Sequence, residues 1–303
     1  MGVINSIVYE TVVYLGPVLL CVLGGLFAYK ANVLNIALEG MMLMGAFMSV
    51  LTAFKTESLG LSYLMAVVST MALGLVFSFF SVKMKGNVIV IGLAINMLVP
   101  AIAGFVMKVM ALPTITLSWF SPRSIQVNIP IIKDIPVIGP ILSGHPPLTY
   151  ISYLMIIIAA VILYKTRFGV YVRVTGENEE AAISLGLKTN WYKTAAILIG
   201  ALCCGLAGAN ISMERLSLFT NNMTASRGFI AIAAIYCGRG KPIPCTLYTI
   251  LFAIINAVAE YFSLQVSASL LLKAVPYFAM VAVLSIASAI NRRNASDRGA
   301  FAD

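Results

Sequence analysis

Long apolar segments recur along the whole chain. Five uncharged runs each approach the ~20 residues that a helix needs to cross a ~30 Å hydrocarbon core. These runs are Thr11–Tyr29, Ser58–Val82, Gly86–Met107, Thr194–Met213 and Ala274–Asn291. The strand-like alternation of a membrane barrel is absent from the pattern. We therefore expect an all-α polytopic membrane protein with eight to ten transmembrane segments. The pattern gives nine, at residues 8–29, 33–54, 61–82, 87–108, 148–164, 193–213, 226–237, 242–262 and 270–290.

The seventh segment, 226–237, differs from the others in length. It is too short to cross a bilayer as a straight helix. Broken or re-entrant helices are tolerated at membrane depth where they are buried in protein or line a cavity. We therefore expect this segment to belong to a broken or re-entrant helix.

Composition supports lipid as the solvent. Hydrophobic residues make up 60% of the chain and charged residues 10%, whereas soluble domains average roughly 45–50% apolar and about 25% charged residues. The stretch Met1–Glu10 has no basic region of the kind that begins a signal peptide, so we expect the first apolar segment to be a true span. The five cysteines lie in or beside apolar segments, as packing residues do.

Basic residues indicate the orientation. If the segments alternate, thirteen of the 20 Lys and Arg residues fall on one side, which the positive-inside rule makes cytoplasmic. The N-terminus is then outside, the proline-rich stretch 111–147 is an extracytoplasmic loop, and 165–193 is a cytoplasmic loop. This assignment requires segment 226–237 to cross the membrane. The thirteen residues are Lys30, Lys83, Lys85, Lys165, Arg167, Arg173, Lys188, Lys193, Arg239, Lys241, Arg292, Arg293 and Arg298.

No catalytic or metal-binding constellation is visible. The single histidine, His145, lies in the predicted outer loop, and no cluster of metal-ligating residues accompanies it. The glycine-rich stretch Gly238–Lys241 lacks the spacing of a phosphate-binding P-loop. We therefore expect no enzyme activity, no bound cofactor and no metal site. The net charge of +9 is explained by cytoplasmic loops, without nucleic acid as a partner.

The predicted cytoplasmic loop contains a short helix motif, Arg173–Leu187 (RVTGENEEAAISLGL). Asn178 is a favourable N-cap, and the two glutamates after it lie where the helix dipole favours anions. Gly186 is suited to end the helix in the left-handed conformation. Either this is a solvated connecting helix, or its apolar side contacts a partner. The residues of that side are Ala181, Ala182 and Leu185.

Polar residues mark the second segment, which begins Asn32–Ala46 (NVLNIALEGMMLMGA). At ~1.5 Å per residue, Glu39 lies roughly 10 Å deeper than Asn32, and Asn35 is one turn away on the same face. A carboxylate at that depth is costly unless it has a partner or faces a cavity. Glu39 therefore either satisfies the backbone of a broken helix or belongs to a translocation pathway or gate.

Polar residues also precede the seventh segment, in Met223–Gly238 (MTASRGFIAIAAIYCG). Thr224 and Ser226 are alternative candidate caps for the helix that follows. Arg227 opposes the dipole at a helix start, so it either reaches water or takes a partner such as Glu214, a carbonyl or a ligand hydroxyl. The candidate pathway or gate residues are Asn35, Glu39, Asn96, Thr224 and Arg227.

Together the three motifs resemble the permease subunits of ATP-binding-cassette (ABC) importers of the branched-chain type, a family that includes simple-sugar and nucleoside importers. The resemblance covers about residues 20–290, and the wording of the early and late motifs looks most like the nucleoside branch. It implies that the cytoplasmic loop couples the permease to an ATPase. The residues that match the coupling loop are Arg173, Gly176, Glu177, Asn178, Glu179, Glu180, Ala181, Ala182, Leu185 and Gly186.

The resemblance also implies the fold and the assembly. We expect residues 1–303 to form one permease domain of the ABC importer fold, in a bacterial cytoplasmic membrane. The expected partners are ABC ATPase subunits that use ATP, a second permease subunit that is identical or homologous, an external solute-binding lipoprotein, and lipid. The expected cargo is a small polar solute, a nucleoside or a simple sugar.

The alternative from another class is an ion-coupled secondary transporter. Such proteins need ionisable groups within the membrane, and Glu39, Glu260 and Lys273 are the candidates here. An intramembrane enzyme is a third possibility, which the lack of paired catalytic residues disfavours.

Overall fold

The computed structural model describes residues 2–127, 141, 143–263 and 275–285, and within them the chain is almost entirely helical. Seven helices are long and apolar enough to cross a membrane, and two shorter apolar helices, Arg227–Cys237 and Val275–Ser285, accompany them. These correspond to the nine predicted segments, although part of 270–290 and the arginines after residue 290 lie outside the described residues. The helices are α1 (Gly2–Lys30), α2 (Leu38–Thr56), α3 (Leu59–Ser78), α4 (Val88–Val109), α6 (Pro147–Lys165), α7 (Arg167–Glu177), α8 (Glu179–Ser184), α9 (Thr189–Ala209), α10 (Arg227–Cys237) and α11 (Pro242–Ser263).

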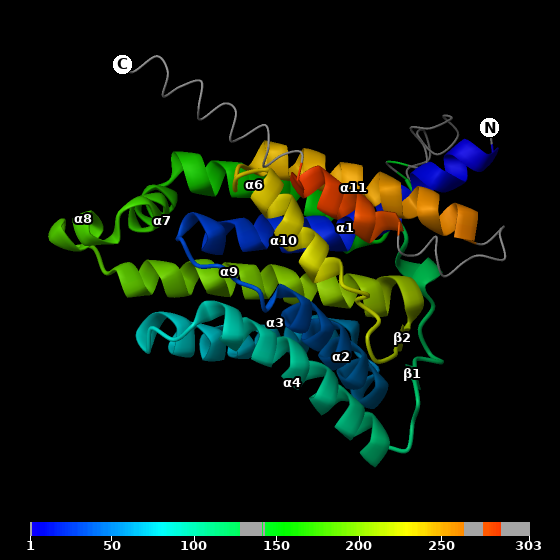
Figure 1. Cartoon of the computed structure of the whole chain (residues 1–303). Coiled ribbons are helices and arrows are strands. Elements are labelled where there is room, and N and C mark those ends of the chain that lie inside the picture. Colours follow the sequence, from blue (N-terminus) through cyan, green and yellow to red (C-terminus); the bar gives the residue numbers. More distant parts are fainter. Residues whose placement is uncertain (1, 128–140, 142, 264–274, 286–303) are drawn as a thin grey trace.

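Helix α1 forms the centre of the bundle, with α6, α9, α10 and α11 packed against it (Figure 1). Small residues permit the closest approaches. A Cβ atom added at Gly24 would lie 3.2 Å from the Cα atom of Gly200 on α9, and one added at Gly45 would lie 2.7 Å from the Cα atom of Gly205. Backbones that approach this closely pack well without large side chains, so α1, α2 and α9 form a tightly packed core.

Two of the long helices end in π-helical turns. Residues η1 (Phe79–Lys83) extend α3, and η3 (Asn210–Leu216) extends α9. After η3 the chain forms β2 (Leu218–Phe219), which pairs antiparallel with β1 (Ile115–Thr116). A short 3₁₀ turn, η2 (Pro122–Ile125), follows β1 in the same region of the chain.

Two chain segments enter the bundle without helical structure. Residues 31–37 run back from the end of α1 before α2 begins at Leu38, and residues 220–226 run inward from β2 before α10 begins. Helix α10 has 11 residues, or about 16 Å at 1.5 Å per residue. It is therefore half of a broken crossing, as its length predicted.

The bundle has two distinct ends (Figure 1). Helices α7 and α8 lie at one end, and β1 and β2 lie at the other. Between β2 and Arg239 the chain passes from one end to the other, because Lys30 at the end of α1 donates a 3.0 Å hydrogen bond to the Arg239 carbonyl. Segment 226–237 and the loop before it therefore complete one crossing, as the predicted orientation requires.

Thiol labelling tests which end is outside. We expect Ser124→Cys, exposed near the β1 end, to react with an impermeant maleimide added to intact cells, because thirteen basic residues favour the opposite side as cytoplasmic. Ser184→Cys on α8 is expected to react only after the cells are opened. The reverse labelling pattern would contradict this orientation.

Candidate translocation and coupling sites

The carboxylate of Glu39 joins the beginnings of α2 and α10. Its Oε1 atom accepts hydrogen bonds from the Thr224 hydroxyl at 2.6 Å and from the Ser226 backbone N–H at 3.0 Å. Its Oε2 atom accepts from the Gly228 N–H at 2.6 Å. The first N–H groups of a helix lack partners within that helix, and its dipole attracts a negative charge there. Glu39 thus supplies the cap that α10 needs within the bundle.

Close backbone approach accompanies this bond network. A Cβ atom added at Gly228 would lie 2.5 Å from both the Cα and N atoms of Glu39. At that distance the backbone of α2 or α10 would have to shift to admit any side chain. Ser226 adopts a left-handed conformation with φ of 62°, which directs its N–H toward Glu39. Helices α2 and α10 therefore fit together only with glycine at 228.

Two asparagines fix the segment that precedes α2. The Oδ1 atom of Asn35, a buried residue, accepts a 3.0 Å hydrogen bond from the Ala37 N–H. Asn96 on α4 reaches across to the same segment, where its Oδ1 accepts from the Gly40 N–H at 2.8 Å and its Nδ2 donates to the Ile36 carbonyl at 2.9 Å. These amides satisfy backbone groups that a broken helix leaves open.

Arg227 takes a carbonyl as its partner, one of the options predicted from the sequence. Its Nη1 donates to the Met223 carbonyl at 3.1 Å, and the guanidinium lies 4.9 Å from the ring centroid of Tyr14. Glu214, another of those options, forms no ion pair with Arg227 in the part of the chain that the structure describes. The contact with Tyr14 ties the start of α10 to the central helix.

Glu214 has a role that the sequence analysis missed. This buried carboxylate accepts from the Asn210 amide at 2.7 Å, from the Tyr63 hydroxyl at 3.1 Å and from the Leu148 N–H at 3.3 Å. It therefore caps α6 much as Glu39 caps α10. Its position at the end of an apolar segment was the available signal, since a carboxylate there needs a partner.

The helix α8 has the ends that its sequence predicts. The Oδ1 atom of Asn178 accepts from the Ala181 N–H at 3.0 Å, and Glu179 and Glu180 occupy the first turn. Gly186 has φ of +77°, and its N–H donates to the Ile183 carbonyl at 2.8 Å. The N–H of the next residue, Leu187, donates to the Ala182 carbonyl at 3.0 Å. This pair of bonds is a Schellman motif, which stops the helix sharply.

The exposed apolar surface of α8 differs from the prediction. Ala182 is fully buried, so it belongs to the interior of the loop and is not on an outward face. The interior position follows from the Schellman motif, which folds the chain after Gly186 back over Ala182. Ala181 is exposed, as expected, and the large apolar side chains that face outward are Ile183, 56% exposed, and Leu185, 74% exposed.

Helix α7 is fixed firmly to the membrane helices. A side chain at Gly176 would collide with the backbone carbonyl of Lys30 at the end of α1. Arg173 stacks on Tyr164 of α6, with its guanidinium 5.0 Å from the ring centroid. Glu177 ends α7 and lines a cleft of about 400 Å³ between this helix and residues 29–34. The end of α1 in turn contacts α10, because the rings of Tyr29 and Tyr236 meet edge to face with their centroids 5.3 Å apart.

An ion pair holds α8 to α9. The Nζ atom of Lys193 donates to Glu179 at 2.6 Å, and this bond, opposed by partial burial, lowers the pKa of Glu179 from its ordinary value of 4.5. A carboxyl with a lowered pKa stabilises the folded state above its unfolded pKa and loses that contribution as pH falls through the lowered value. The pair therefore persists at neutral pH and opens only in acid. With Glu179 43% exposed, it is worth less than about 1 kcal/mol.

Comparison with known proteins gives the family. A family model described as the permease component of a branched-chain amino acid transport system matches residues 7–284. The chain belongs to this permease family. It is therefore the non-catalytic membrane component of an ABC importer, multi-pass in the cytoplasmic membrane, and ATP is hydrolysed by a separate ATPase subunit. Family membership also excludes the ion-coupled and intramembrane-enzyme alternatives.

Proteins similar to this chain are named for the transport of nucleosides or a sugar. The chain is 29% identical over 276 residues to the nucleoside ABC transporter permease NupC of Lactococcus lactis subsp. cremoris, covering 86% of this chain and 84% of the relative. It is 34% identical over 250 residues to the guanosine permease NupQ of Bacillus subtilis, covering 80% and 77%. The glucose permease TsgC13 assigned to Haloferax volcanii is 26% identical over 257 residues, covering 85% and 76%.

A solved structure shares the fold. It is an ABC transporter of the metal-chelate type, by its description, in an inward-facing conformation. The match has a TM-score of 0.53 and 18% identity, and it covers 92% of this chain and 84% of the other. The all-α permease fold expected from the sequence is thereby confirmed.

Proposed function

We propose that this permease imports a nucleoside. The observation that carries the proposal is its 34% identity with the guanosine permease NupQ, joined by a second nucleoside permease at 29%. A simple sugar is the second candidate, because a glucose permease also matches over most of the chain. Both solutes are neutral and rich in hydroxyl groups, so side-chain amides and hydroxyls suit them as weak, transient partners.

The proposed pathway runs along the loop 220–226. Asn221 and Asn222 are exposed in it, and two neighbouring elements support it. The Asn221 amide donates to the Pro100 carbonyl of α4 at 3.5 Å, and the Tyr277 hydroxyl donates to the Ala225 carbonyl at 3.1 Å. The amides and the phenol give this face the hydrogen-bonding groups that a nucleoside requires.

A second permease subunit is proposed to cover this face. Helix α4 and the helix Val275–Ser285 flank the loop and carry large exposed apolar side chains, among them Met97, Phe105 and Phe278, each at least 69% exposed. Apolar side chains on membrane helices can face lipid, but the irregular polar loop between them cannot, so this face needs protein to cover it. Pairing across it would place the loops of two subunits around one pathway.

The five predicted pathway residues are proposed to act as a gate, without direct contact with the solute. Their polar atoms bond to one another or to the backbone, as described above for Glu39, Asn35 and Asn96. Thr224 is buried, and Arg227 is held against Tyr14. Such a network fixes the position of α10 and of loop 220–226, so a shift of α10 would open or close the pathway.

Coupling to the ATPase is proposed to occur through α8. Ile183 and Leu185 form an exposed apolar tip on a capped helix, which fits a groove on the ATPase subunit. A displacement of α8 would be transmitted to α7. From α7 it would reach the end of α1 through the contact of Gly176 with Lys30. From there the Lys30–Arg239 hydrogen bond reaches the chain that follows α10. The proposed external lipoprotein would dock at the opposite end, around β1.

Competition for uptake tests the substrate class. In cells that express the whole transporter, we expect uptake of a labelled nucleoside to be inhibited by excess unlabelled nucleoside and unaffected by the same excess of glucose or ribose. Cells that lack only this permease serve as the background. Inhibition by sugars and none by nucleosides would assign the permease to the sugar branch.

A further inference from the structure

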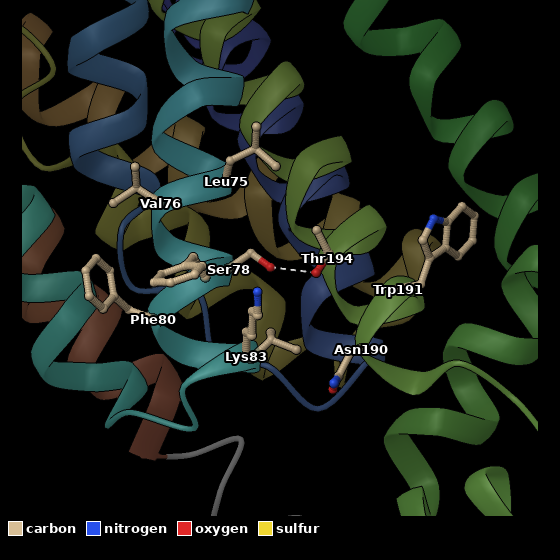
Figure 2. A pocket seen from close by; sticks show the side chains of 10 residues that line it. Leu75, Val76, Ser78, Phe80, Lys83, Asn190, Trp191 and Thr194 are labelled. Carbon is tan, nitrogen blue, oxygen red and sulfur yellow. Dashed lines mark hydrogen bonds between the residues drawn. The ribbon is translucent and has the colours of Figure 1, made fainter.

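An open cleft lies between α3, with its extension η1, and α9 (Figure 2). Its volume is about 690 Å³, and it lies at the end of the bundle that carries α7 and α8, the predicted cytoplasmic end. No part of the proposed gate or of the α8 tip contributes to it. The residues that line it are Leu75, Val76, Ser78, Phe79, Phe80, Val82, Lys83, Asn190, Trp191 and Thr194.

The cleft arises where two tightly packed helices separate. Farther into the bundle, a Cβ atom added at Gly74 would lie 2.8 Å from the Cβ atom of Ala201, so α3 and α9 are in close contact there. At the cleft a 2.7 Å hydrogen bond joins the Ser78 and Thr194 hydroxyls. Beyond it α3 becomes π-helical, with one more residue per hydrogen-bonded turn, and such turns are frequent at functional sites.

The walls of the cleft are apolar, while its mouth carries a cation. Leu75, Val76 and Phe79 are each about half exposed, as lipid-facing side chains of a membrane-spanning helix are. Lys83 lies over the ring of Phe79, 5.4 Å from its centroid, and in Figure 2 its side chain extends toward the Ser78–Thr194 pair. Among the described residues no carboxylate forms an ion pair with Lys83. The cleft thus combines an apolar wall with a positive charge that lacks a counter-ion.

We propose that this cleft binds one anionic phospholipid of the cytoplasmic leaflet. An acyl chain lies along Leu75, Val76 and Phe79, and the headgroup phosphate pairs with Lys83. Basic pockets between helices at the cytoplasmic side are suited to acidic headgroups, because that leaflet is negatively charged. Trp191 lies on the other wall and is 59% exposed. Tryptophan is enriched at the level of the lipid headgroups in membrane proteins.

The alternative occupant is a second protein subunit. The charge of Lys83 favours the lipid, since an interface between subunits that buried it would need a carboxylate opposite it. The face proposed for the second permease is formed by α4 and Val275–Ser285, and neither of them lines the cleft. The lipid proposal therefore does not compete with the proposed interface between permease subunits.

The two tryptophans of the chain allow a direct test. Trp119→Phe leaves Trp191 as the single tryptophan of this subunit, inside the proposed site. In the transporter assembled with tryptophan-free partner subunits, brominated phosphatidylglycerol and brominated phosphatidylcholine with the same acyl chains are titrated as quenchers of its fluorescence. We expect phosphatidylglycerol to bind about fivefold more tightly, the factor that one basic residue near a charged surface supplies.

Two charge-matched variants separate a site from general attraction. Lys83→Gln is expected to abolish the preference for phosphatidylglycerol. Lys85→Gln removes an equal charge two residues away, outside the cleft lining, and is expected to leave the preference unchanged. Equal quenching by both lipids in the parent protein, or a preference that survives Lys83→Gln, would overturn the proposal. A Trp191 that neither lipid quenches would show that a protein subunit covers the cleft.

Discussion

Replacing Glu39 with glutamine is expected to reduce ATP-driven uptake at least about tenfold while the protein still inserts in the membrane. The carboxylate accepts three hydrogen bonds from the start of α10 and the residues just before it, and glutamine offers only one oxygen for them. Hydrogen bonds to a charged group contribute about 1.5–3 kcal/mol each, and 1.4 kcal/mol corresponds to a factor of ten. The measurement is initial uptake, normalised to the amount of assembled transporter in the membrane.

The matched control for this variant lies at the other end of the same helix. Glu57 is an exposed carboxylate that follows α2, and Glu57→Gln is expected to transport normally. Gly228→Ala tests the same junction without changing its charge, because the added methyl group would collide with the backbone of Glu39. Normal uptake by both Glu39→Gln and Gly228→Ala would contradict the proposed gate.

Replacing Leu185 with glutamate is expected to weaken binding of the ATPase subunit at least about 30-fold. Leu185 is the most exposed large apolar residue of the α8 tip, and its burial in a partner groove would make it a hot spot, worth about 2 kcal/mol or more. The helix itself should persist, since its caps are at Asn178 and Gly186. The measurement is co-purification of the ATPase with the permease at increasing dilution.

An identical substitution at the opposite end of the bundle is the control. Leu216 is 50% exposed near β2, and Leu216→Glu is expected to leave ATPase binding unchanged. Ala182→Glu is a poor test of docking, because Ala182 is buried and the variant would disturb α8 itself. Full ATPase binding by Leu185→Glu would leave α8 as a solvated connecting helix and remove it from the coupling route.

Local features of the chain were predictable from the sequence because they depend on nearby residues. The apolar segments follow from hydropathy, and the short helix α10 follows from the length of its segment. The ends of α8 were predicted correctly, since Asn178 and Gly186 act on backbone groups within a few residues. Each of these features requires no knowledge of the tertiary structure.

Long-range partners were not predictable in the same way. Glu39 bonds to residues more than 180 positions away, so the sequence showed only that its carboxylate needed a partner. Several partners were open for Arg227; it bonds to the Met223 carbonyl, whereas Glu214, another candidate, caps α6. Ala182 was expected to be outward because its helical position suited an exposed face, whereas the chain after Gly186 folds over it.

Energised uptake by the purified assembly tests the central claim most directly. The permease, its ATPase and its binding protein would be reconstituted in vesicles, and accumulation of a labelled nucleoside would be followed with ATP on the ATPase side. We predict accumulation that requires ATP and the binding protein, stops when the catalytic carboxylate of the ATPase is neutralised, and continues in the presence of a protonophore. Accumulation that persists with the inactive ATPase and collapses with the protonophore would contradict the account.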